Sequence, residues 1–284
     1  MIADWDTNTL FVSDLLVTKH RELYDSLRSV LNGVSIEIIP DTADIWCRDF
    51  MPIQLAENRF CKFVYDPDYL KDYPDRVTPE DRCRLPFMED YRSEPIKLDG
   101  GNVVASRARV ILTDKIYNEN KAIARPRLRE RLKELFQAEC IIIRKEPYDW
   151  VGHADGVVRF VTEDRVLVND YSSIDPDYGE WLRKLLEGKG LEVETLPWFM
   201  EKARSRRDGL QSAVGNYINY LRVGNVVVVP RYDRPEVDDD AMRKVRETIP
   251  DASVFQVPCR KLAEDGGVLN CTSWTIKSSA RDQA

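Results

Sequence analysis

The sequence predicts an α/β fold in which one structural unit recurs five times around an axis. Apolar, β-branched strand candidates begin near Phe11, Phe60, Arg109, Arg165 and Asn225, a spacing of roughly 50–60 residues that is near the range typical of internal repeats. Helix-period segments follow four of these strands, and each unit ends in a strand-like segment that carries polar residues. One alternative stays open, an ordinary α/β sheet in which strands and helices merely alternate.

The first strand of each unit is predicted from near-continuous apolar runs, which are typical of strands covered on both faces. The clearest runs are Leu10–Asp14, Val110–Asp114, Val166–Asp170 and Val226–Pro230. Helices are predicted over residues 18–31, 119–137, 177–188 and 236–248, where apolar residues recur at helical spacing. A second strand follows each helix, over Val34–Ile39, Cys140–Arg144, Leu191–Leu196 and Ala252–Val257. In the second unit, a proline- and charge-rich stretch around Asp66–Pro95 replaces the helix.

Five polar closing segments hold most of the candidate chemistry. They are Trp46–Ile53, Gly100–Ser106, Gly152–Phe160, Asn216–Val223 and Gly266–Ile276. If the units repeat around an axis, equivalent strand ends meet at one centre although they lie far apart in the sequence. We therefore expect one central site within a single domain that spans residues 1–284.

Composition and charge exclude several classes of function. The chain has 43% hydrophobic and 32% charged residues, as an ordinary globular protein has. Its net charge of −7 argues against nucleic acid as the main partner. No apolar run approaches the roughly 20 residues that span a bilayer, so no membrane partner is expected. Residues 1–6 lack the basic and apolar regions of a signal peptide, which predicts a cytoplasmic protein.

The cysteines indicate free thiols and no metal site. Six are present, and in a reducing compartment free thiols are the better expectation. No Cys-x-x-Cys pair exists, and two histidines cannot supply a zinc site of the usual spacing.

Three closing segments together supply two carboxylates, one imidazole and one thiol. His153 and Asp155 lie two residues apart on a predicted strand, so they are expected to point to the same face. His153 is one of only two histidines and is the obvious acid–base candidate. Asp49 and Cys271 come from the first and fifth closing segments. Paired carboxylates suit a planar guanidinium, and a thiolate placed against its carbon makes covalent attack plausible. The structural alternatives are a buried cysteine at Cys271 and a local ion pair between Arg48 and Asp49.

Five segments, taken in order, resemble the agmatine deiminase and bacterial-type peptidylarginine deiminase family. They are Trp46–Pro52, Leu98–Asn102, Gly152–Asp155, Asn216–Tyr220 and Gly266–Cys271. The resemblance spans nearly the whole chain. It implies the pentein fold, a five-bladed α/β propeller of the guanidino-group-modifying superfamily with ββαβ-type units around a pseudo-fivefold axis.

The resemblance also implies roles for particular residues. It assigns Cys271 as the nucleophile, His153 as the general acid and base, and Asp49 and Asp155 as the carboxylates that grip the guanidinium. Further substrate-binding positions are Trp46, Gly101, Asn102 and Asn219. No cofactor is implied. Attack of the thiol on the guanidinium carbon would release ammonia, and the covalent thiouronium intermediate would hydrolyse to a ureido product such as N-carbamoylputrescine.

Several alternatives stay open at this stage. Asn270 stands where agmatine deiminases usually have a histidine, and Asp99 where a glutamate is common, which leaves the tail of the guanidino substrate undetermined. An amidinotransferase, a peptidyl-arginine deiminase or a non-catalytic guanidino-binding protein would use the same scaffold, and a homodimer is also left open. Residues 66–92 and 201–212 are both candidates for a lid. The basic run Lys202–Arg207 is either a solvated loop or the part of such a lid that meets an anionic group on the substrate.

Overall fold

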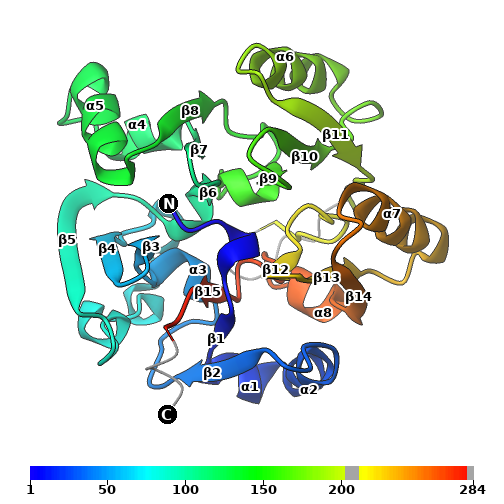
Figure 1. The fold of residues 1–284 in the computed structure, drawn as a ribbon, viewed down its shortest axis with the longest axis horizontal. Coiled ribbons are helices and arrows are strands. Elements are labelled where there is room, and N and C mark those ends of the chain that lie inside the picture. The colour runs from blue at the N-terminus through cyan, green and yellow to red at the C-terminus, as the bar shows by residue number, and fades with distance from the viewer. Residues whose placement is uncertain (202–210, 280–284) are drawn as a thin grey trace.

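The computed structural model describes residues 1–201 and 211–279, and they form five small sheets around a central axis (Figure 1). Each sheet has three strands, here called inner, middle and outer. The inner strand is antiparallel to the middle strand, and the middle strand is parallel to the outer strand, in all five sheets. The chain therefore folds as an α/β propeller of the pentein type, as predicted.

The five middle strands are the apolar runs that the sequence singles out. In chain order they are β1 (Thr9–Ser13), β4 (Arg59–Val64), β7 (Arg109–Thr113), β10 (Arg165–Asn169) and β13 (Val226–Arg231). Their outer partners are β2 (Ser35–Ile39), β5 (Asp90–Lys97), β8 (Glu139–Ile143), β11 (Glu192–Leu196) and β14 (Ser253–Pro258). The middle strands agree with the predicted runs, which are buried by neighbouring sheets and helices. Four of the outer strands agree with the predicted second strands, whereas β5 was not predicted, because it begins within the proline- and charge-rich stretch.

Helices lie on the outside of the ring (Figure 1). They are α1 (Asp14–Lys19), α2 (Arg21–Val30), α4 (Lys115–Glu119), α5 (Arg125–Phe136), α6 (Pro176–Glu187) and α7 (Pro235–Thr248). Helix α6 illustrates why they form. Its N-cap residue Asp175 accepts the backbone N–H of Tyr178 at 3.0 Å, Pro176 fits the first helical position, and Tyr178, Leu182 and Leu186 form one buried stripe.

The second unit has no α-helix between its middle and outer strands, as predicted. Three short 3-10 helices take its place, η2 (Asp68–Leu70), η3 (Pro74–Arg76) and η4 (Glu80–Cys83). Leu70, Cys83 and Met88 from this stretch are buried in a cluster with Phe60 of β4, so the segment covers its sheet without a helix.

The closing segments differ from the expected strands in their first halves. The inner strands are β3 (Ile53–Ala56), β6 (Val104–Ala105), β9 (Val158–Phe160), β12 (Leu221–Val223) and β15 (Trp274–Ile276). Helical turns precede three of them, α3 (Cys47–Phe50), η5 (Gly100–Asn102) and η6 (Ala154–Gly156). The prediction that Gly152–Phe160 is a continuous strand was wrong. Alternation along a strand therefore does not explain how His153 and Asp155 converge.

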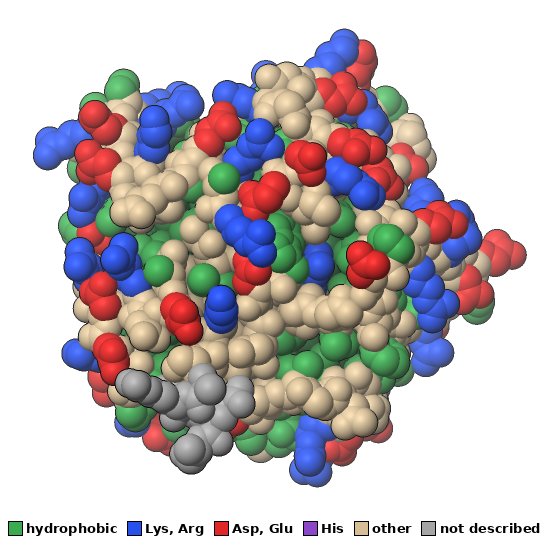
Figure 2. Space-filling view, viewed as in Figure 1, with side chains coloured by type: hydrophobic (Ala, Val, Ile, Leu, Met, Phe, Trp, Pro, Cys, Tyr) green, Lys and Arg blue, Asp and Glu red, His purple; other side chains and the backbone are tan. Residues whose placement is uncertain are grey.

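The ring is closed by its last and first strands, because β15 pairs with β1 and Trp274 lies opposite Phe11. Trp274 is 3% exposed, packs on the rings of Phe11 and Phe60, and donates its Nε1–H to the Pro52 carbonyl at 2.8 Å. On the face seen in Figure 2, basic and acidic side chains of the described residues are interspersed. None of the described helices has the length and apolar character that a membrane crossing requires.

Replacing Trp274 by alanine is expected to lower the free energy of unfolding by about 3–5 kcal/mol, the usual range for a buried large aromatic side chain. Urea unfolding followed by circular dichroism measures the loss. Lys277→Ala, an exposed position just beyond the same strand, is the control and should change stability by less than about 0.5 kcal/mol. Equal losses in the two variants would contradict the packing at the ring closure.

Candidate active site

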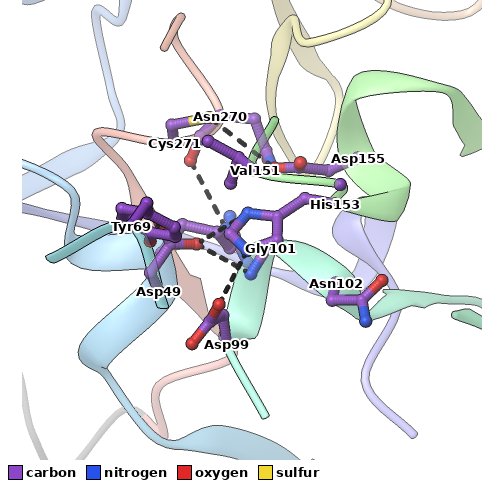
Figure 3. Close-up of polar contacts among 12 residues, drawn as sticks. Asp49, Tyr69, Asp99, Gly101, Asn102, Val151, His153, Asp155, Asn270 and Cys271 are labelled. Carbon is purple, nitrogen blue, oxygen red and sulfur yellow. Dashed lines mark hydrogen bonds and ion pairs between the residues drawn. The ribbon is translucent and has the colours of Figure 1, made fainter. Parts of the chain in front are cut away.

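The candidate residues meet at the axis, at the amino-terminal ends of the inner strands. Asp49 lies in α3 ahead of β3, Asp155 in η6 ahead of β9, and Cys271 in the turn before β15. His153 is the N-cap residue of η6, and Asn219 precedes β12. Figure 3 shows His153, Asp49, Asp155 and Cys271 around one small space. These residues come from four of the five units, and Asp99 and Gly101 ahead of β6 add the remaining one.

His153 is held between two carboxylates. Its Nε2 lies 2.9 Å from Oδ2 of Asp99, and its Nδ1 lies 3.4 Å from Oδ1 of Asp49. The imidazole is buried, which by itself lowers the pKa of His153. The charges of Asp49 and Asp99 outweigh burial and raise that pKa to about 9. His153 is therefore an imidazolium at neutral pH and can donate a proton.

Gly101 allows the close approach of Asp49 to His153. Its N–H donates to Oδ1 of Asp49 at 3.0 Å. A Cβ at this position would lie 2.6 Å from that oxygen and 2.6 Å from Nδ1 of His153, so a side chain would force the pair apart. The Tyr69 hydroxyl donates to the other carboxylate oxygen of Asp49 at 3.4 Å.

The two carboxylate oxygens of Asp155 differ in their contacts. Its Oδ2 accepts the Asn270 side-chain amide at 2.6 Å and lies 3.9 Å from Sγ of Cys271. Its Oδ1 is buried and has no hydrogen-bond partner among the described residues. A buried carboxylate oxygen without a donor is costly. The geometry therefore favours a donor-rich, cationic ligand beside Cys271.

Asn219 orders the loop that carries the thiol. Its Oδ1 accepts the backbone N–H groups of Asn270 at 3.1 Å and Cys271 at 3.3 Å. The same oxygen lies 3.4 Å from Sγ of Cys271, and its Nδ2 donates to the backbone carbonyl of Asp155 at 3.2 Å. One side chain thus joins the fourth unit to the third and the fifth.

The surroundings of Cys271 favour the thiol over the thiolate. Burial raises its pKa well above the usual value, and the negative charges of Asp155 and Asp49 raise it further. A cation placed against Asp155 and Asp49 would offset these charges and favour the thiolate. A positively charged ligand bound beside these carboxylates would therefore make the thiol more reactive.

The sequence indicated no role for Asp99, Lys115 or Tyr69, although Asp99 is the second residue of the motif Leu98–Asn102. Lys115, at the start of α4, donates its Nζ to Oδ2 of Asp99 at 2.6 Å and lies 3.1 Å from Oε1 of Glu119. Tyr69 lies edge-on to His153 and beneath the Lys115 ammonium, with a ring-to-Nζ distance of 5.3 Å. Tyr69 belongs to η2, so the candidate lid over residues 66–92 contributes a side chain to the site.

Two predicted substrate-binding residues lie behind the cluster. The Trp46 ring packs against Gly267, where a Cβ would lie 2.5 Å from the ring. Asn102 is fully buried and accepts the backbone N–H of Thr113 at 2.8 Å, and Figure 3 shows it pointing away from Cys271. The structure therefore brings Asp49, Gly101 and Asn219 to the catalytic cluster, but not Trp46 or Asn102.

A cavity leads to Cys271, His153 and Asp155, and its other walls are aromatic and acidic. They include Tyr148, Trp150, Trp198, Phe199, Glu146 and Asp149. Gln211 and Ser212 also line it, whereas residues 202–210 of the second lid candidate, including the basic run Lys202–Arg207, lie outside the described residues. Within residues 1–201 and 211–279, no group of three or more His, Cys, Asp or Glu side chains is placed to hold a metal ion.

Comparisons with known proteins agree with this geometry. Residues 2–276 match the family model described as Porphyromonas-type peptidyl-arginine deiminase. The chain is 24% identical to the agmatine deiminase of Stutzerimonas stutzeri, over 88% of this chain and 79% of that protein. It is 23% identical to the agmatine deiminase of Pseudomonas fluorescens, over 87% of this chain and 78% of that protein.

Solved structures share the fold at low identity. The agmatine deiminase of Enterococcus faecalis gives a TM-score of 0.81 at 16% identity, covering 98% of this chain and 95% of that chain. A variant agmatine deiminase of C. jejuni with substrate bound gives 0.79 at 16% identity, covering 98% of this chain and 96% of that chain. These likenesses support the propeller fold.

Asp155→Asn is expected to accelerate the alkylation of Cys271 by iodoacetamide near neutral pH by at least about tenfold, the effect of one pKa unit. The amide keeps the shape of the side chain but removes a negative charge that raises the thiol pKa. Peptide mass mapping over time measures the rate. Asp164→Asn, at an exposed position, should leave it unchanged. A slower reaction in Asp155→Asn would contradict the electrostatic account.

Proposed function

Because the chain belongs to the Porphyromonas-type peptidyl-arginine deiminase family, we propose that it hydrolyses the guanidino group of a small substrate to a ureido group and ammonia. Agmatine is the leading substrate. One observation carries the proposal, namely that Oδ1 of Asp155 is buried without a partner among the described residues, while Oδ2 of the same carboxylate lies 3.9 Å from Sγ of Cys271. A guanidinium supplies the N–H groups and the positive charge that Oδ1 lacks.

The first half of the reaction uses Cys271 as the nucleophile and His153 as the acid. The guanidinium binds between Asp155 and Asp49, and its charge promotes loss of the Cys271 proton to solvent through the cavity. The thiolate attacks the guanidinium carbon and forms a C–S bond. The imidazolium of His153 then protonates a nitrogen, the C–N bond breaks and ammonia leaves, so that a thiouronium cation remains on sulfur.

The second half uses the neutral His153 that the first half produces. Water adds to the thiouronium carbon while His153 takes one of its protons. The C–S bond then breaks, the thiolate leaves, and the remaining hydroxyl loses its proton as the ureido carbonyl forms. One ammonium and one ureido product result from one guanidinium and one water, and no redox change occurs.

The cavity supports a substrate whose tail is cationic. Glu146 is 5% exposed, and its Oε1 has no hydrogen-bond partner among the described residues. Asp149, by contrast, already accepts the backbone N–H groups of Val151 at 2.8 Å and Gly152 at 2.9 Å. Burial and the charge of Asp149 raise the pKa of Glu146 to about 8, and a bound ammonium would lower it again. The carboxylate of free arginine would instead meet these two acidic side chains.

We also propose that residues 1–284 form one pentein domain and that the protein is cytoplasmic. Neither nucleic acid nor a membrane is expected as a partner, and a homodimer is left open. Pairing of the last strand with the first supports the single domain. All six cysteines are free in the structure, in keeping with a reducing compartment.

The function is tested by measuring ammonia and ureido product from agmatine, free arginine, peptidyl-arginine and methylguanidine. Agmatine is expected to turn over fastest, and Cys271→Ala should abolish turnover while leaving the circular dichroism spectrum unchanged. Transfer of the amidino group to an added amine, without ammonia release, would indicate an amidinotransferase instead. Turnover that survives in Cys271→Ala would rule out the covalent route, and silence across both assays would leave only a binding protein.

Glu146→Gln is expected to raise KM for agmatine about tenfold or more, because a charge-assisted hydrogen bond contributes about 1.5–3 kcal/mol. Steady-state kinetics with butylguanidine, which has the same carbon chain but no ammonium, provide the matched control and should show little change. Equal effects on the two substrates would show that Glu146 does not sense the tail charge.

A further inference from the structure

Lys115 is a buried cation with no part in the proposed attack by Cys271 or in the proposed contacts to the substrate. It is 5% exposed, although a lysine is rarely buried unless it is paired. Its Nζ contacts Oδ2 of Asp99 at 2.6 Å and Oε1 of Glu119 at 3.1 Å, and it lies 3.5 Å from Nε2 of His153. The ammonium therefore belongs to the same charge cluster as the catalytic imidazole.

One carboxylate oxygen of Asp99 serves both cations. Oδ2 accepts Lys115 at 2.6 Å and His153 at 2.9 Å. Because one oxygen is shared, the bond to Lys115 weakens the hold of Asp99 on the imidazole proton. The like charges of Lys115 and the imidazolium also repel each other across 3.5 Å.

The groups that surround His153 come from several elements. Asp49 approaches from α3, Asp99 from the turn before η5, and Lys115 from α4. Tyr69 of η2 packs edge-on against the ring, and Asp155 and Cys271 lie on its far side (Figure 3). Among these charged groups, the Lys115 ammonium lowers the pKa of His153, whereas the carboxylates of Asp49 and Asp99 raise it.

We propose that Lys115 is a positioning residue that draws the Asp99 carboxylate partly away from His153, so that the imidazole can release its proton as well as hold it. Both abilities are needed, because His153 gives a proton to the leaving ammonia and then takes one from water. Without Lys115, the two carboxylates would keep the imidazole ring protonated. Hydrolysis of the thiouronium intermediate would then be slower, because this step needs the neutral ring. The catalytic consequence rests on the proposed deimination, whereas the effect on His153 does not.

The direct test is the NMR titration of His153 in the full chain without substrate. The chain has only two histidines, so His153→Gln identifies the signal and His20 serves as an internal reference. In Lys115→Met the midpoint of His153 is expected to rise by about one pH unit or more, since a like charge close to the ring has been removed. Lys121→Met is the matched control, because this exposed lysine lines the same surface groove as Lys115 and should leave the midpoint unchanged.

A second variant tests whether a change in Lys115→Met comes from misfolding. Lys115→Met leaves the Glu119 carboxylate without its lysine, so Lys115→Met/Glu119→Gln removes both charges together. The double variant should show the same upward shift, and Lys115→Arg should restore most of the wild-type midpoint. An unchanged or lowered midpoint in a folded double variant would overturn the proposal.

Kinetics separate this role from simple structural support. At neutral pH, kcat of Lys115→Met on the best substrate is expected to fall about tenfold, as one pH unit in the midpoint implies, while KM changes little. Intact-mass analysis after rapid quenching should show the thiouronium adduct on Cys271 accumulating. A fall in kcat without the adduct would also overturn the proposal. If the wild type turns over no substrate, the proposed function fails, and the NMR titration still decides the role of Lys115.

Discussion

The contact on which the rest of the site depends is the imidazole of His153 held between Asp49 and Asp99. Two buried carboxylates keep the ring protonated, and the ring in turn compensates for their burial. Asp49 also acts on the thiol, because burial, the charge of Asp155 and the charge of Asp49 together raise the pKa of Cys271. The surrounding groups therefore favour a protonated His153 and an un-ionised Cys271, and a cation bound beside Asp155 and Asp49 would make the thiol more reactive.

The propeller makes this arrangement possible because it gathers short turns from distant parts of the chain at one axis. Each inner strand begins at the axis, and the residue just ahead of it is free to carry a polar side chain, while the middle and outer strands supply the buried apolar mass. Asn219 then bridges two neighbouring turns through its amide. The charged groups can be buried because each one meets a partner from a different unit, and no single unit contains a complete site.

Much of the fold was predictable from the sequence, since the middle strands are near-continuous apolar runs and the outer helices have clear apolar stripes. The helical turns ahead of the inner strands were not, because a three-residue turn leaves no periodic signal and depends on local backbone hydrogen bonds. The resemblance led to Cys271, His153, Asp49 and Asp155, which the structure does gather. It gave no role to Lys115, because a lysine that begins a short helix looks like any solvated lysine until the fold buries it.

Ring closure links the stability of the fold to the geometry of the site. The turn with Cys271 leads directly into β15, which pairs with β1, and the backbone N–H of Arg48 donates to the Cys271 carbonyl at 3.1 Å. The nucleophile is thus attached both to the strand that closes the ring and to the turn that carries Asp49. Opening the ring between β15 and β1 would weaken the link between Cys271 and the turn that carries Asp49. Because the sulfur responds to charges only a few ångströms away, even a small displacement of this strand would change the reactivity of the thiol.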